Sequence, residues 1–266
     1  MIRRDLFWGF VVTIFGGSIF PGGTVEDGDG GGGGEPQADA VLFEIEGATA
    51  VDPSDILASV AQDPDDGTIT IVLDDDTISN TPALAAKWTQ TLTDIYGNVS
   101  DYDLQNVFRA LMKVAELAPP SADLWLGVAL ESDDDRGIAW RLASVSGDWQ
   151  VQHAARATGG GAWSAWTAAT SNASTQTLDC NPTMGTATNQ LRHTGYARDT
   201  SGTPLGGTST TAMSQVAGVG GDFTKISLCA GWVTGTGATV PATVNLQLGH
   251  FLAKLTEVPL FASFFQ

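Results

Sequence analysis

The chain has 266 residues, of which 42% are hydrophobic and 16% are charged. A chain of this size can bury a core as one large domain or two small ones, which excludes a wholly disordered protein. The formal net charge of −18, from 12 basic and 30 acidic residues, would repel phosphate groups and argues against a nucleic-acid partner. The 32 glycines favour many turns over long helices.

An apolar segment at 6–20, LFWGFVVTIFGGSIF, follows a short basic stretch. Two interpretations are open: a signal peptide or membrane anchor, and a docking arm buried in another subunit. Asp5 interrupts the junction, no Ala-x-Ala cleavage site precedes Pro21, and the segment is shorter than the roughly 20 residues of a membrane helix. These features favour a docking arm at 1–23. Its main contacts would be Leu6, Phe7, Trp8, Phe10, Phe15 and Phe20.

A linker is predicted at 24–37, because this stretch contains the run DGDGGGGGE and glycine gives a chain conformational freedom. The run resembles a calcium loop only at its start, since the later ligand positions are glycines. The two cysteines, Cys180 and Cys229, have no CxxC spacing and no histidine at a metal-ligand interval. We therefore expect no metal and no cofactor. A disulfide and two buried free thiols both remain open, and the thiols are favoured.

Alternating patterns predict strands at 41–46 (VLFEIE) and 67–73 (GTITIVL). The segment at 82–96 is compatible with either a helix or a strand. The segment at 103–117 has helical propensity but also a partial period of two, and the strong β signal that follows favours a strand. Strands are predicted next at 124–130, 138–145, 149–155, 190–198, 223–233 and 243–255, the last split by Gly249 as a bulge or bend.

The C-terminal stretch at 258–266, VPLFASFFQ, is strongly apolar. Such side chains are rarely left in water, so they pack on the domain or on a neighbour, and the neighbour is favoured. The candidate subunit contacts are Leu260, Phe261, Phe264 and Phe265.

The run LWLGVAL at 124–130, with IAWRLASV and WQVQHAA after it, resembles concanavalin A-like jelly-roll domains. The later runs TKISLCAGWVTGTG and VNLQLGHFLAKL look like the closing strands of such domains. The family recurs in tail-fibre, spike and head-decoration proteins of bacteriophages. The resemblance implies an all-β jelly-roll β-sandwich at 81–266, with a small β segment at 38–80 that is a candidate part of the sandwich.

The resemblance also implies a function: a non-enzymatic structural protein of the phage virion, displayed as a fibre, spike or decoration element. Its partners would be other virion proteins, further copies of the chain with a trimer favoured, and a cell-surface glycan. Two other classes stay open. One is a secreted or membrane-tethered bacterial carbohydrate-binding protein, and the other is a jelly-roll polysaccharide-cleaving enzyme.

Candidate chemistry in the sequence is sparse, and we expect no catalytic residues. Glu44 and Glu46 would share one face of a strand, which suits a carboxylate pair, but alternating outward residues explain them equally well. The aspartate runs at 74–76 and 133–135 are expected to be solvated turns, and His153 and His193 ordinary strand residues. The candidate glycan-binding residues are Trp163 and Trp166, because exposed indoles stack on sugars. Core packing is expected for Trp125, Trp140, Trp149 and Trp232.

Overall fold

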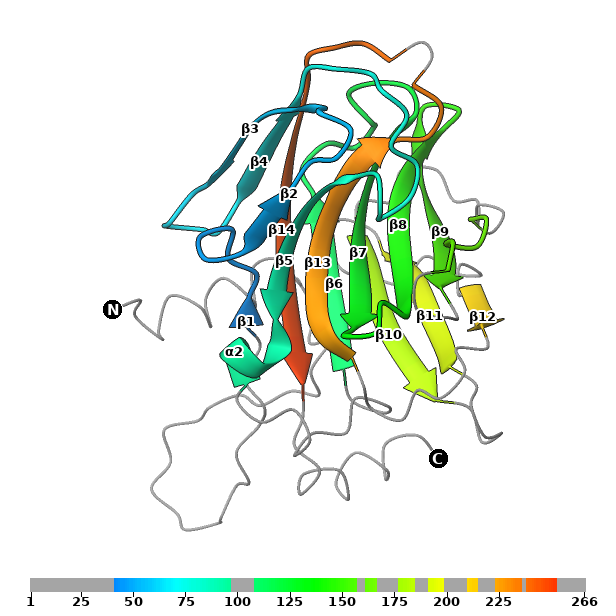
Figure 1. Cartoon of the computed structure of the whole chain (residues 1–266). Coiled ribbons are helices and arrows are strands. Elements are labelled where there is room, and N and C mark those ends of the chain that lie inside the picture. Colours follow the sequence, from blue (N-terminus) through cyan, green and yellow to red (C-terminus); the bar gives the residue numbers. More distant parts are fainter. Residues whose placement is uncertain are drawn as a thin grey trace, which may run out of the picture.

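The computed structural model describes residues 41–96, 108–156, 161–166, 177–184, 191–198, 210–214, 223–235 and 238–252. Within these ranges almost all regular structure is β, and the strands form two antiparallel sheets that face each other (Figure 1). The predicted fold class, an all-β sandwich, is confirmed. The predicted docking arm, linker and apolar tail lie outside the described residues, as do the residues named in them. Among the described residues no helix is long and apolar enough to cross a membrane.

Within the described ranges the elements follow one another in chain order as a succession of short strands with one short helix. They are β1 (Val41–Leu42), β2 (Thr49–Val51), β3 (Leu57–Gln62), β4 (Ile69–Leu73), β5 (Ala86–Thr91), α2 (Leu92–Tyr96), β6 (Phe108–Val114), β7 (Leu124–Ser132), β8 (Gly137–Val145), β9 (Asp148–Arg156), β10 (Thr177–Met184), β11 (Leu191–Arg198), β12 (Thr210–Ser214), β13 (Phe223–Trp232) and β14 (Ala242–Leu252).

The eight-stranded sheet has the order β12-β11-β10-β6-β14-β4-β3, and β1 also pairs with β14. The six-stranded sheet has the order β2-β5-β13-β7-β8-β9. The chain crosses repeatedly between the two sheets, which is the connectivity of a jelly roll. Strands at 41–73 contribute to both sheets, so the small β segment expected at 38–80 is continuous with the rest.

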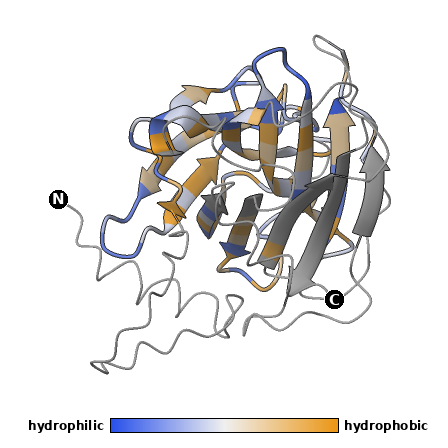
Figure 2. Ribbon diagram, turned by 90° about the horizontal axis from the view of Figure 1, so that it is seen from below, coloured by the Kyte–Doolittle hydropathy of each residue, from blue (hydrophilic) through white to orange (hydrophobic). Residues whose placement is uncertain are grey.

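The core lies between the sheets, because alternate residues of each strand point inward. In β4 the buried residues are Ile69, Ile71 and Leu73, with half-buried residues between them. The six-stranded sheet contributes Trp88, Trp140, Trp149 and Trp232, all with at most 1% of their surface exposed. Figure 2 shows apolar residues recurring along the strands when the sandwich is viewed from below.

Three sequence predictions change in detail. The strand predicted at 41–46 ends at Leu42, so Glu44 lies in irregular chain and Glu46 in a turn. Gly249 does not split β14, because its pairing with β6 continues through Gly249 in register. The ambiguous segment at 82–96 contains both alternatives, with strand β5 followed by helix α2.

The segment at 103–117 contains β6, as favoured from the sequence. The strands predicted after Pro120 are also found, as β7, β8, β9, β11, β13 and β14. Four of the described strands were not predicted: β2, β3, β10 and β12.

Candidate functional site

The outer face of the six-stranded sheet, the side turned away from the core, has a floor of small residues. These are Gly127, Ala129, Gly137, Ala139, Ala143 and Cys229, all buried. The floor tolerates no addition at Gly127, where a Cβ would lie 2.4 Å from the Trp140 carbonyl oxygen. Trp125 lies in the same cluster. It is buried as expected, but on this outer face rather than between the sheets.

The segment at 161–166 packs over this floor and carries the two candidate glycan-binding tryptophans, both half-buried. Ser164 ties the segment to β9: its N–H donates to the Ala155 carbonyl at 2.8 Å, and its Oγ accepts from the Ala155 N–H at 3.0 Å. The indole of Trp163 comes so close to Gly137 that a Cβ there would lie 2.9 Å from Cη2 of the ring. The segment is therefore held at both its backbone and its side chains.

An arginine lies over each of these two indoles. The Arg141 guanidinium carbon is 4.1 Å from the Trp166 ring centroid, and the Arg156 carbon is 4.9 Å from that of Trp163. The Trp166 Nε1–H donates to the carbonyl of Asn80. A sugar could stack only on the ring surface that the guanidinium leaves open. Glycan binding by this pair stays a prediction.

Arg141 lies in the interior of this cluster, with 2% of its surface exposed. Its Nε–H donates to Gln152 Oε1 at 2.7 Å, and its guanidinium is also 5.5 Å from the Trp125 ring centroid. Burial lowers the pKa of Arg141 to about 9, so the group remains charged at neutral pH.

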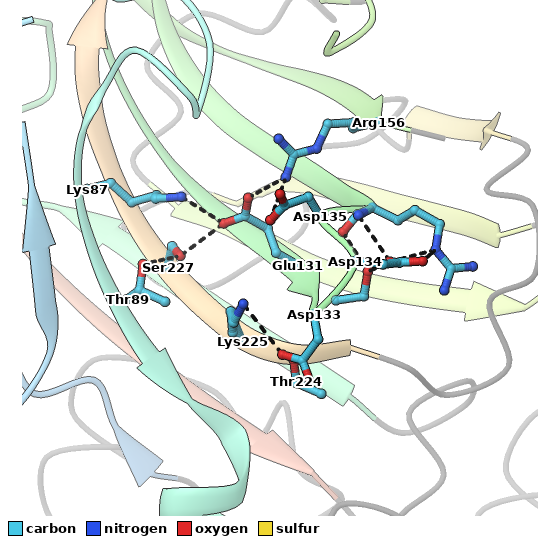
Figure 3. Close-up of polar contacts among 12 residues, drawn as sticks. Lys87, Thr89, Glu131, Asp133, Asp134, Asp135, Arg156, Thr224, Lys225 and Ser227 are labelled. Carbon is cyan, nitrogen blue, oxygen red and sulfur yellow. Dashed lines mark hydrogen bonds and ion pairs between the residues drawn. The ribbon is translucent and has the colours of Figure 1, made fainter. Parts of the chain in front are cut away.

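Glu131 forms the centre of a charged cluster on the same face (Figure 3). Lys87 Nζ lies 3.0 Å from its Oε2, and Arg156 Nη2 lies 2.9 Å from its Oε1. Ser227 Oγ adds a hydrogen bond to Oε2 at 3.4 Å and lies 2.9 Å from Thr89 Oγ1. One carboxylate thus joins side chains from β5, β9 and β13, and both of its oxygens are engaged by cations.

The aspartates at 133–135 lie in the β7–β8 hairpin, as the sequence predicts for a solvated turn. Asp134 binds Arg136 Nε at 2.7 Å, and hydrogen bonds from Arg136 and Ser132 lower the pKa of Asp134 to about 2. Asp133 lies 3.5 Å from Lys225 Nζ and accepts from Thr224 Oγ1 at 2.8 Å. Cationic and hydroxyl side chains of the protein therefore bind the carboxylates of Asp133 and Asp134. Among the described residues there is also no group of side chains that could hold a metal ion.

The described histidines are poorly suited to act as bases near neutral pH. Desolvation by burial lowers the pKa of His153 to about 4 and that of His250 to about 3. The side chain of His193 lies outside the described residues. Cys229 is a free, buried thiol, as favoured from the sequence, and burial raises its pKa to about 12. The side chain of Cys180 is not described.

The expected placement of Glu44 and Glu46 on one face of a strand is wrong, because neither residue lies on a strand; both side chains are exposed. Sequence analysis missed the cluster of Glu131, Lys87 and Arg156. The available signal was a charged residue at an outward position in each of three strands, of which only β7 is otherwise largely apolar. Since these residues lie 44 and 25 positions apart, only the strand register brings them together.

No protein-family model matches the chain, and no curated protein matches it. Among solved structures, a protein of unknown function from Shewanella oneidensis MR-1 is 13% identical with a TM-score of 0.42, over 81% of this chain and 85% of that one. Alginate lyase A1-II', a member of polysaccharide lyase family 7, is 10% identical with a TM-score of 0.42, over 74% and 85%.

The CBM2 module of the evolved Dit of Lactobacillus casei BL23 phage J-1 is also similar. It is 10% identical with a TM-score of 0.38, over 68% of this chain and 76% of that one. Likenesses this low carry no argument about function.

Proposed function

We propose that the chain is a non-enzymatic structural protein of a phage particle, in which an N-terminal arm at 1–23 docks on the virion and the β-sandwich is displayed. The observation that supports its non-enzymatic character is the state of Glu131. Glycoside hydrolysis needs one carboxyl group to give a proton and another to act as base or nucleophile. Glu131 is instead held between Lys87 and Arg156, an arrangement that suits a structural cross-link.

A display role also suits the rigidity of the outer face. The segment at 161–166 is fixed by backbone hydrogen bonds and by Arg141 and Arg156 lying over its indoles. A face that is already packed needs little reordering to present a fixed surface, which lowers the entropic cost of binding. Multiple copies, with a trimer favoured, would add avidity to a weak glycan affinity.

The first test is enzymatic. The full chain is incubated with a panel of neutral and acidic polysaccharides, and reducing ends and unsaturated products are measured. We expect no turnover. Turnover by the purified wild-type chain would overturn the non-enzymatic assignment and support the polysaccharide-cleaving alternative.

The second test concerns location. Purified particles are examined by mass spectrometry for the intact chain, and a chain lacking 1–23 is tested for incorporation. We expect the intact chain in particles and loss of the truncated one. A mature protein that starts near Gly22 in the medium or envelope would instead support the bacterial carbohydrate-binding alternative. Normal incorporation without 1–23 would show that the arm is not the anchor.

A further inference from the structure

The outer face of the eight-stranded sheet has a groove that neither the sequence nor the proposed function assigns. Its volume is about 440 Å³, within the range of small-molecule sites. We call it the lysine groove and define it by Thr68, Lys113, Ala115, Leu117 and Gln247. The buried residues Val114 and Leu246 complete its lining.

Strand register places the polar residues of the groove side by side. Gln247 of β14 pairs with Lys113 of β6, and Asn245 of β14 pairs with Thr70 of β4. Thr68, just before β4, joins the same row, because Gln247 Nε2 donates to its Oγ1 at 3.2 Å. The groove therefore crosses three adjacent strands.

Hydrogen bonds hold this surface in place. Glu116 Oε1 accepts from the backbone N–H of Asn245 at 3.1 Å and from its Nδ2 at 2.9 Å. Asn245 Oδ1 in turn accepts from Thr70 Oγ1 at 2.8 Å. The carbonyl of Glu116 accepts from Trp149 Nε1 at 3.0 Å, which fixes the chain beside the groove. A ligand would thus meet side chains that are already ordered.

Lys113 is the cation of the groove. Among the described residues no carboxylate lies within ion-pair distance of it, whereas Lys87, Arg136, Arg156 and Lys225 all have carboxylate partners. The Glu116 carboxylate nearby is bound to Asn245. An ammonium group in this state can bind an anion without first giving up a protein partner.

The opposite end of the groove favours hydroxyl groups over a second anion. Gln247 Nε2 lies 3.3 Å from the Asp66 carbonyl, and the Asp66 carboxylate accepts from the Thr68 N–H at 2.8 Å. Negative charge at this end would repel a polyanion. Leu117 is 61% exposed and offers an aliphatic surface of the kind that packs against the C–H face of a pyranose.

We propose that the lysine groove binds an acidic saccharide of the uronate class, with its carboxylate on Lys113, its hydroxyls toward Gln247 and Thr68, and its ring against Leu117. The chain's net charge of −18 does not prevent this. At physiological ionic strength charges more than about 8 Å away are largely screened, so the groups of the groove itself decide. Lys113 attracts the carboxylate of the ligand, whereas the Glu116 carboxylate is hydrogen-bonded to Asn245. This proposal does not depend on the virion location.

The test is calorimetric or NMR titration of the full chain with a galactose oligosaccharide that carries a single galacturonate residue, and with the matched neutral oligogalactoside. Variants are Lys113→Gln, Lys113→Arg and the control Lys225→Gln, which removes one positive charge on the other sheet. Loss of a charge-assisted contact is worth about tenfold or more in affinity. We expect the acidic ligand to bind at least tenfold more tightly than the neutral one. Lys113→Gln should remove that preference, while Lys113→Arg and Lys225→Gln largely retain it.

Any of three other results would overturn the proposal. No binding of the acidic ligand at millimolar concentration, equal binding of both ligands, or equal losses in Lys113→Gln and Lys225→Gln would do so. Circular dichroism of every variant separates a lost site from a lost fold. Because turnover and particle incorporation are not measured here, a negative result leaves the proposed function standing.

Discussion

Replacing Glu131 by Gln tests whether the charged cluster on the six-stranded sheet is a structural cross-link. The substitution keeps the shape of the side chain but removes the charge that faces Lys87 and Arg156. The exposed fractions of these side chains are 7% for Glu131, 19% for Lys87 and 11% for Arg156. Arg156 would therefore keep a buried charge with its main partner lost.

Breaking a buried ion pair by removing one partner costs about 3–5 kcal/mol. The amide oxygen of Gln can still accept one hydrogen bond, and Lys87 is exposed enough to regain some water. We therefore expect a loss of about 2–3 kcal/mol in the free energy of unfolding. For a chain of this size that corresponds to a fall in Tm of roughly 4–12 °C.

The measurements are urea unfolding and thermal melting followed by circular dichroism. Glu46→Gln is the matched control, because it makes the same chemical change at an exposed turn residue and should stay within about 0.5 kcal/mol of wild type. Arg156→Gln combined with Glu131→Gln should cost less than the sum of the two single changes. If Glu131→Gln is as stable as Glu46→Gln, the cross-link is not structural.

Three further predictions concern stability and reactivity. Gly127→Ala should destabilise the chain by about 2 kcal/mol or more in urea unfolding, because its Cβ would lie 2.4 Å from the Trp140 carbonyl oxygen; unchanged stability would show that the strand can shift. The contribution of His153 and His250 to the free energy of unfolding should be fully present above pH 6.5 and fall toward pH 4. Their folded-state pKa values, about 4 and about 3, lie below the unfolded value, so on acidification the unfolded chain takes up protons first and is stabilised. A smaller fall in His250→Asn would support this assignment. Cys229, whose pKa is raised to about 12, should resist iodoacetamide at pH 8 in the folded chain and react in guanidinium, as peptide mass spectrometry can show.

The strands that could be predicted from the sequence are those with a strong local pattern. β7, β8 and β9 combine apolar residues with turns at Asp133–Asp135 and Ser146–Gly147, so each boundary is visible without knowing a partner strand. The short strand β2 and the strands β3, β10 and β12 lack this pattern. In β3 exposed and half-buried residues follow no regular alternation, and β10 contains Pro182. These strands form because a neighbouring strand offers hydrogen bonds, which the local sequence does not record.

The candidate site was harder to predict than the fold. The sequence identified Trp163 and Trp166 as candidate surface residues. It did not predict that the guanidinium groups of Arg141 and Arg156 lie over their rings. Likewise the lysine groove depends on Gln247 lying opposite Lys113, a pairing set by the register of β14 on β6. A single-residue slip would turn either side chain to the core.

The two sheets share a dependence on the last described part of the chain. β13 lies between β5 and β7, and β14 lies between β6 and β4, so the two final strands are central in both sheets. During synthesis on the ribosome, neither sheet can be completed until residues 223–252 have emerged. The waiting edges of β5, β6 and β7 are then open to pairing with other chains. Emergence of residues 223–252 therefore acts as the checkpoint for folding, and a chain cut short before residue 223 should aggregate rather than form half a sandwich.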